Sequence, residues 1–309
     1  MTESADTTLV GVDIGGTRTR LAILDALGRV LADRETPTPR EDEGEALARW
    51  IDEAYHQCRA ETSHASPPQR MGVGVPGILA PNREVVVRAV NLDFLEGFPL
   101  RDALVERTGL ETVIDCDAVA SAWGEYCARE RIPKRFAYLT IGTGVGGAVI
   151  LEGAIVRHTH HNAGHLGHLI CDASDDAPVC PCGARGCLEA CVGGPAIARA
   201  AKRAGFDEIG EVEPAVQNED ETAMGLVEGL AGHLAVGLIN LAHVYPVDLL
   251  VVGGGIACCL PSLVRRAARR AGTCDSVLIP ERMTVELTAL KGYAGVVGAA
   301  LLANETPAR

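Results

Sequence analysis

The sequence predicts an α/β protein built from two similar halves. Short apolar strands alternate with amphipathic helices along most of the chain, which is typical of this fold class. A turn that combines glycine with threonine joins two strands in each half, first at Gly15-Gly16-Thr17 and again at Gly142-Thr143-Gly144. The length of 309 residues is sufficient for two domains of ordinary size.

The two halves are expected to divide within the helix that we predict over residues 118–129. Residues 1–122 then form an N-terminal lobe, and residues 123–293 form a C-terminal lobe that contains a cysteine-rich segment. The last helix, within residues 294–309, is expected to pack back on the N-terminal lobe.

Composition excludes several classes of protein. The net charge of −13 argues against a nucleic-acid surface and against binding to an anionic membrane. No apolar run is as long as a bilayer-spanning segment requires. Residues 1–6 are polar and acidic, unlike a secretory signal, so the eleven cysteines are expected to be reduced in a cytoplasmic protein. Such thiols bind metal where they cluster and fill cores where they are scattered.

The N-terminal half opens with three predicted strands, at residues 8–14, 19–24 and 30–36. Gly15 and Gly16 allow backbone amides to approach an anion closely, and Thr17 adds a hydroxyl. Asp13, at the end of the first strand, can hold a hydrated magnesium ion. The segment lacks the Gly-Lys-Ser/Thr of a Walker loop.

An amphipathic helix over residues 43–59 follows, and then buried strands at 71–75 and 111–116. Asp117 stands where the second of these strands meets the helix over 118–129. Its carboxylate can cap that helix. It can equally act as a catalytic base, because ligands of α/β sheets collect beyond the carboxyl ends of strands.

The C-terminal half repeats the hairpin. A strand at residues 136–141 turns through Gly142, Thr143 and Gly144 into a second strand, so two hairpins from two halves could clamp one polyphosphate. Farther along, a strand at 248–252 leads into Gly253-Gly254-Gly255, which opens a helix and suits close approach of an adenine or a phosphate. The remaining predicted elements are helices at 194–204, 222–242 and 295–302 and a strand at 284–290.

A structural zinc site is predicted from one histidine and three cysteines. Cys180, Cys182 and Cys187 lie within eight residues and His168 lies twelve residues upstream, which makes a closed tetrahedral ligand set. Cys171 and Cys191 flank this segment and are possible substitute ligands. The run His158-Thr159-His160-His161 could be another metal site, but we favour a solvated loop.

Taken in order, these motifs resemble the ROK family of repressors, uncharacterised open reading frames and sugar kinases. The match covers nearly the whole chain, from residue 8 to about residue 303. The cysteine-rich motif, found together with the other motifs, is highly specific for the family. The motifs are Asp13-Ile14-Gly15-Gly16-Thr17, Gly74-Val75-Pro76-Gly77, Asn91-Leu92, Asp117, Gly142-Thr143-Gly144-Val145-Gly146-Gly147, Gly164-His165-Leu166-Gly167-His168, Cys180-Pro181-Cys182-Gly183-Ala184-Arg185-Gly186-Cys187-Leu188-Glu189 and Gly253-Gly254-Gly255.

The resemblance implies an actin-like ATPase fold (ribonuclease H-like), in which duplicated domains flank an interlobe cleft. It also implies that Asp13 and the glycine turns, including Gly253, Gly254 and Gly255, hold Mg²⁺ and ATP. Asp117 matches the base that deprotonates the sugar hydroxyl, and the zinc would be structural. Gly77, Asn91, His168 and Glu189 match positions that line or support a small-molecule sugar. Family members suggest a homodimer.

The sequence departs from the family pattern at three places. The usual Asn-Asp-Ala-Asn reads Cys116-Asp117-Ala118-Val119, so a thiol, which is a weak hydrogen-bonding group, replaces an amide that contacts sugar hydroxyls. His165 stands where most members carry Glu. Some bacterial N-acetylmannosamine kinases resemble this chain in having His at that position. Tyr293 stands where Asp is frequent, and we infer nothing from it.

Three functions are compatible with this resemblance. The first is ATP-dependent phosphorylation of the 6-hydroxyl of a hexose, as in a glucokinase, or of an N-acylhexosamine, as in an N-acetylmannosamine kinase. The second is a repressor, but only seven residues precede the first strand and the chain is acidic, which disfavours DNA binding. The third is a catalytically weak sugar sensor, because both amides beside Asp117 are missing.

Overall fold

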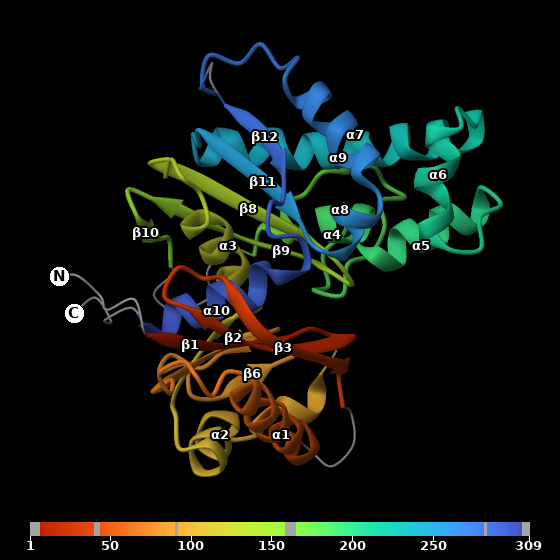
Figure 1. The fold of residues 1–309 in the computed structure, drawn as a ribbon. Helices are drawn as coiled ribbons and strands as arrows, with labels where there is room; N and C mark the ends of the chain where they lie inside the picture. Colours follow the sequence, from red (N-terminus) through yellow and green to blue (C-terminus); the bar gives the residue numbers. More distant parts are fainter. Residues whose placement is uncertain (1–6, 40–43, 90–91, 158–164, 281–282, 305–309) are drawn as a thin grey trace. The chain divides into compact units, whose positions relative to one another are not determined.

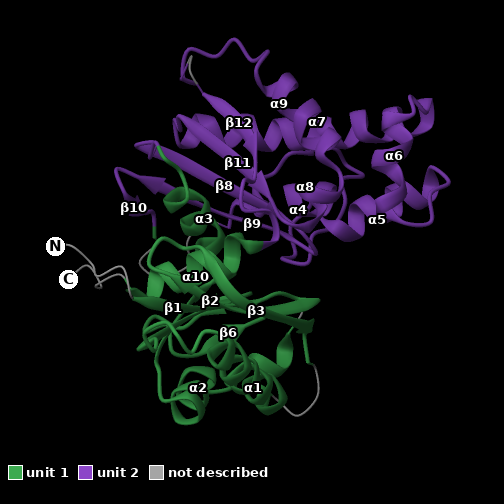
Figure 2. Cartoon of the chain, in the orientation of Figure 1, with its two compact units in different colours: residues 1–130, 157–163, 293–309 green, residues 131–156, 164–292 purple. Residues whose placement is uncertain are grey.

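In a computed structural model of the chain, two compact units are present (Figures 1 and 2). The residues that the structure describes are 7–39, 44–89, 92–157, 165–280 and 283–304. Unit 1 comprises residues 1–130, 157–163 and 293–309, and unit 2 comprises residues 131–156 and 164–292. The first break lies after residue 130 and not after residue 122, because the helix that begins at Asp117 belongs wholly to unit 1.

A mixed five-stranded sheet forms the centre of unit 1. Its strand order is β3-β2-β1-β4-β7, with antiparallel pairing from β3 to β1 and parallel pairing from β1 to β7. The strands are β1 (Thr8–Ile14), β2 (Arg18–Asp25), β3 (Val30–Pro37), β4 (Arg70–Val75) and β7 (Glu111–Cys116). A small hairpin, β5 (Ile78–Leu79) with β6 (Val86–Arg88), was not expected from the sequence.

Unit 2 contains a second sheet with the same plan. Its order is β10-β9-β8-β11-β12, and again the first three strands pair antiparallel and the last three pair parallel. The strands are β8 (Arg135–Ile141), β9 (Val145–Leu151), β10 (Ala154–Ile155), β11 (Leu249–Gly253) and β12 (Thr284–Leu287). The repeat of order and direction is the duplication that the two glycine turns predict.

Helices cover both faces of the unit 1 sheet (Figure 1). On one face α1 packs against β2 and β3 and also contacts α2; its buried stripe includes Leu47, Ile51 and Tyr55. On the other face α10 lies on β1 and β4 and packs along α3. The helices are α1 (Glu45–Glu61), α2 (Leu100–Thr108), α3 (Asp117–Cys127) and α10 (Ala294–Asn304), with short 3₁₀ turns η2 (Asp93–Leu95) and η5 (Lys291–Tyr293).

Glycines let α10 lie unusually close to its neighbours. A Cβ added at Gly72 of β4 would overlap the carbonyl oxygen of Ala299, and one at Gly11 of β1 would overlap that of Val296. A Cβ at Gly298 would overlap the carbonyl oxygen of Ala120 in α3. The last helix is therefore seated on unit 1 by backbone contacts that no larger residue permits.

In unit 2 the long helix α7 is the centre of the core. Its apolar stripe packs with residues of β8, β11 and α9, and its N-cap is Asp220, whose carboxylate accepts the Ala223 amide. By length and composition alone α7 could span a bilayer, which the sequence analysis did not anticipate; here its buried residues fill the core of unit 2. The helices are α4 (Leu188–Val192), α5 (Gly194–Arg203), α6 (Val212–Gln217), α7 (Glu221–Val244), α8 (Gly255–Cys259) and α9 (Pro261–Ala271), with 3₁₀ turns η3 (Leu166–His168) and η4 (Ile209–Glu211).

Replacing Gly298 by alanine is expected to destabilise the protein by about 3 kcal/mol or more, because the added methyl cannot fit against the α3 backbone. Gly225→Ala is the matched control, since nothing lies within 4 Å of a Cβ at that position of α7. The control is expected to be neutral or stabilising by up to about 1 kcal/mol. Urea unfolding of both variants measures the difference, and equal midpoints would contradict the close approach of α10.

Candidate functional site

In unit 1, the ends of β1 and β7, with β4 between them, bring acidic residues to one edge of the sheet. Asp13 of β1 is paired with Gly74 of β4, and Gly74 is paired in turn with Asp115 of β7. Asp117 begins α3 directly after β7, and its Cα would lie 3.4 Å from a Cβ added at Gly74. The parallel register of β1, β4 and β7 therefore places Asp13 and Asp117 at the same edge.

The two carboxylates interact electrostatically. Burial, with the negative charge of Asp117 as the next cause, raises the pKa of Asp13 to about 7, while Arg20 opposes this rise. Burial also raises the pKa of Asp117. Two desolvated carboxylates that repel each other form a place where a divalent cation would relieve the repulsion.

Asp117 is the first residue of α3 and not its N-cap. The N-cap of α3 is Cys116, and no side chain makes a capping bond there. Asp117 Oδ1 accepts the Ala118 amide at 2.7 Å and lies 3.4 Å from the Cys116 thiol, and both contacts oppose the rise in its pKa. Burial raises the pKa of Cys116, so the thiol stays protonated and donates to the carboxylate.

The first glycine turn is closed by its own backbone. The Gly15 amide donates to the Arg18 carbonyl at 2.8 Å, which leaves the exposed Thr17 at the tip. Gly295, in the first turn of α10, lies against the Asp13 carboxylate so closely that a Cβ would overlap it. The sequence analysis missed Gly295 because its partner lies at the other end of the chain.

The other sugar-binding residues predicted in unit 1 have different outcomes. Gly77 follows β4 with a φ of 110°, and a Cβ there would overlap the Arg88 carbonyl of β6, so only glycine fits. Asn91 lies outside the described residues, as does the run from His158 to His161.

In unit 2, the predicted zinc ligands come together. His168, Cys180, Cys182 and Cys187 each present a donor atom, and all four atoms lie within 4.8 Å of one another. Cys180 Sγ is 3.6 Å from His168 Nδ1, and Cys182 Sγ is 3.6 Å from Cys187 Sγ. Two ligands of a tetrahedral zinc lie about 3.5–3.8 Å apart, so the donor set fits this ion. We call these four residues the knot.

Glu189 connects the knot with the second glycine turn. Its Oε2 accepts the Val145 amide at 2.9 Å, and its Oε1 lies 3.6 Å from Cys180 Sγ. The same carboxylate presses against Gly144, where a Cβ would overlap it. The Gly194 amide of α5 donates to the Gly142 carbonyl at 2.8 Å, so the turn is held from both α4 and α5.

The second turn is also closed by a backbone hydrogen bond of its own. The Gly142 amide donates to the Gly144 carbonyl at 2.9 Å and leaves Thr143 exposed at the tip. Gly254, with a φ of 90°, packs against Thr140 and Ile141 at the end of β8, next to this turn. The glycines at 253–255 and those at 142–144 are thus neighbours within unit 2.

His165 precedes the short η3 turn and His168 ends it, with ring centroids 5.8 Å apart. His165 is exposed and His168 is half-buried. Because Gly167 lies directly on the Val145 carbonyl, η3 is fixed to the start of β9, and the two imidazoles are fixed with it.

A buried ion network beside Asp117 was missed by the sequence analysis. Asp115 is 3% exposed and pairs with Arg83 at 2.9 Å and with Arg157 at 2.6 Å. It also accepts the Cys116 amide at 2.8 Å. An aspartate inside the apolar strand 111–116 was the one available signal, but nothing local identifies its distant partners. Tyr293, the third departure, stacks on Arg20 at 4.2 Å.

Comparison with known proteins identifies the family. The model of the ROK family matches residues 9–306, nearly the entire chain. The chain belongs to the ROK family. The predicted actin-like ATPase fold and the enzyme class, a sugar kinase, are both confirmed.

Several ROK relatives are similar over almost their full length. A glucokinase of Halalkalibacterium halodurans is 29% identical over 97% of this chain and 96% of its own. An N-acetylmannosamine kinase of Escherichia coli is 33% identical over 96% of this chain and 98% of its own. The crystal structure of a ROK glucokinase from Streptomyces griseus, in complex with glucose and AMPPNP, has a TM-score of 0.81 and 29% identity over 97% of this chain and 100% of its own.

The raised pKa of Asp13 predicts a pH-dependent cost in stability for this ROK protein without metal. Between the ordinary aspartate value near 4 and about 7, the folded state keeps a proton that the unfolded state has released. The free energy of unfolding therefore falls as pH rises through this window. The fall in the free energy of unfolding is about 4 kcal/mol at most. Asp13→Asn is expected to lack this fall and to be more stable than the wild type at pH 8.

Thermal unfolding in EDTA at pH 5 and pH 8 measures this effect. Asp275→Asn, at an exposed site of unit 2, is the control and is expected to follow the wild type. Parallel stability curves for Asp13→Asn and wild type would show that Asp13 ionises normally.

Proposed function

We propose that this ROK sugar kinase transfers the γ-phosphoryl group of ATP to the 6-hydroxyl of a hexose, with glucose as the first candidate. The observation that carries the proposal is the pair of carboxylates, Asp13 and Asp117, at the carboxyl edge of the unit 1 sheet. Phosphoryl transfer needs chiefly positioning and neutralisation of charge, together with a base for the attacking hydroxyl.

Asp117 is the proposed base. Its raised pKa makes the carboxylate a stronger proton acceptor than an ordinary aspartate, while its contacts with the Ala118 amide and the Cys116 thiol fix the orientation of Oδ1. Oδ2 would then take the proton from the 6-hydroxyl as the bond to phosphorus forms. Asp115 positions this segment because its carboxylate, held by the ion pair with Arg157, accepts a hydrogen bond from the Cys116 amide.

The nucleotide is assigned to Asp13 and to the glycine turns. Asp13 would hold Mg²⁺ through water, and that ion would neutralise charge on the phosphates. The turns at Gly15, Gly16 and Thr17 and at Gly142, Thr143 and Gly144 offer backbone and a threonine hydroxyl to phosphate oxygens. The adenosine is assigned to the glycines at 253–255. Support for ATP as the donor comes from the AMPPNP in the Streptomyces griseus glucokinase.

The sugar is assigned to Gly77, Asn91, Cys116, His165, His168 and Glu189. Structural zinc in the knot would bind His168 through Nδ1, the nitrogen that lies toward Cys180. That bond would fix the tautomer and leave Nε2 for a sugar hydroxyl. Glu189 would contact the sugar while its carboxylate also accepts the Val145 amide.

An N-acylhexosamine, as in N-acetylmannosamine kinases, is the second candidate. His165 favours it, because an imidazole in place of the usual glutamate changes the contact offered to the C1–C2 side of the sugar. A 33% identical relative of that name agrees with this candidate. Cys116 is the residue that favours the remaining alternative, a catalytically weak sugar sensor, because a thiol bonds sugar hydroxyls poorly.

We further propose that the enzyme is a cytoplasmic homodimer without nucleic-acid or membrane partners. The net charge of −13 disfavours both polyanions. Thiols stay reduced and available for a metal in the cytosol, which supports the location.

A coupled ADP-release assay over a panel of hexoses and N-acylhexosamines tests the function. Glucose, or else N-acetylmannosamine, is expected to give the highest kcat/KM. Asp117→Asn is expected to lower kcat by about 100- to 10,000-fold while sugar binding, measured by calorimetry, persists. If no sugar raises ADP release in the wild type, the protein is a sensor; strong turnover in Asp117→Asn would assign the base elsewhere.

Loss of zinc from the knot is expected to weaken sugar binding about tenfold, because His168 then loses its fixed orientation. Cys182→Ala tests this by calorimetry with the preferred sugar. Cys274→Ala, a half-buried cysteine outside the knot, is the control. Unchanged affinity in Cys182→Ala, with its zinc absent, would separate the knot from sugar recognition.

A further inference from the structure

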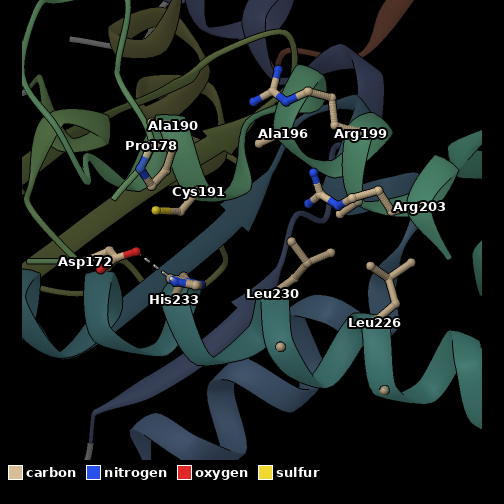
Figure 3. Close-up of a pocket in the computed structure, with 13 residues that line it drawn as sticks. Asp172, Pro178, Ala190, Cys191, Ala196, Arg199, Arg203, Leu226, Leu230 and His233 are labelled. Atoms are coloured by element: carbon tan, nitrogen blue, oxygen red, sulfur yellow. Dashed lines mark ion pairs between the residues drawn. The ribbon is translucent and has the colours of Figure 1, made fainter. Parts of the chain in front are cut away.

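A cavity of about 460 Å³ opens on unit 2 between α5 and α7 (Figure 3). Arg199 and Arg203 of α5 form one wall. The facing side of α7 contributes Gly225 and Gly229, where an added Cβ would meet nothing within 4 Å. The absence of side chains on two successive turns of α7 therefore keeps the cavity open.

One end of this cavity carries three metal-binding side chains that the proposed kinase chemistry does not use. Asp172, Cys191 and His233 each present a donor atom, and the three atoms lie within 4.8 Å of one another. They come from three parts of unit 2: the segment after η3, the helix α4 and the helix α7. Figure 3 shows Asp172 and His233 directed toward each other, with the Cys191 sulfur nearby.

We propose that Asp172, Cys191 and His233 form a second zinc site, with the fourth position of the ion facing the cavity. Thiolate, imidazole and carboxylate together are a donor set that zinc prefers. His233 Nε2 is 3.8 Å from Asp172 Oδ2, close to the spacing of about 3.4 Å between two such ligands on tetrahedral zinc. Small side-chain rotations would complete the geometry.

The surroundings of the three residues support a metal over a simple ion pair. Asp172 Oδ1 accepts the Ser174 amide at 3.0 Å and the Ser174 hydroxyl at 2.6 Å, so Oδ2 is left directed at His233. Carboxylate ligands of metals are commonly oriented by such outer hydrogen bonds. Cys191 is only 8% exposed, and the Cys171 thiol is hydrogen-bonded to it.

The second site would act on the same short helix as the knot. α4 begins directly after Cys187, carries Glu189 and contains Cys191. Zinc at Asp172, Cys191 and His233 would join α4 to α7, while the knot holds the residue before α4. The proposal is independent of the kinase assignment, because it concerns metal content alone.

Zinc bound per chain, measured by mass spectrometry after equilibration with zinc and gel filtration, tests the site. The wild type is expected to hold two ions and both His233→Ala and Asp172→Asn one. The knot variant Cys182→Ala should also hold one ion. A variant that combines Cys182→Ala with His233→Ala should hold none. His243→Ala, at another histidine of α7, is the control and should hold two. Circular dichroism confirms that each variant is folded.

Cobalt substitution gives an independent readout. The knot supplies three sulfurs and the second site one, so His233→Ala should retain the strong sulfur-to-cobalt absorption while losing one cobalt per chain. A wild type with a single ion that His233→Ala does not reduce would overturn the proposal. Recovery of Cys171 and Cys191 as a disulfide in the folded protein would overturn it as well.

Discussion

The parallel register of β1, β4 and β7 is the constraint on which unit 1 depends. It brings Asp13 and Asp117 to one edge, where burial raises the pKa of each carboxyl and the charge of Asp117 raises that of Asp13 further. Such an arrangement costs stability and persists because the surrounding structure holds it. Gly295 of α10 closes on Asp13, and the seating of α10 depends in turn on glycines in β1 and β4. The proposed Mg²⁺ ligand Asp13 is thus also a packing contact of α10.

The duplicated sheet gives each unit a glycine turn, but the two turns are supported differently. In unit 1 the turn at Gly15 closes on Arg18 and stands beside the acidic pair. In unit 2 the turn at Gly142 is braced by the Gly194 amide and by the Glu189 carboxylate. The second turn is therefore connected to the knot through Glu189, whereas the first is held by Arg18 and by Thr38, which follows β3. The same sheet topology thus holds its glycine turn by different contacts in the two units.

The residues of both proposed metal sites lie around α4, a helix too short to be stable by itself. Zinc in the knot would fix its beginning, and its core contacts include Leu188 and Val192. Residues whose positions matter most for the proposed sugar site, His168 and Glu189, adjoin these ligands in sequence. Burial of its apolar residues orders this helix, and zinc in the knot would add to that order.

The sequence by itself determined the alternation of strands and helices, the two glycine turns and the knot. Each of these is a local signal: periodicity within one element, or ligand spacing within one loop, is fixed by the chain before it folds. Tertiary structure alone decided that Asp115 pairs with Arg157, that Gly295 meets Asp13, and that His233 meets Asp172. Those partners lie far apart in the sequence, and they meet only because strand register and helix packing place them together. No spacing rule along the chain encodes that placement.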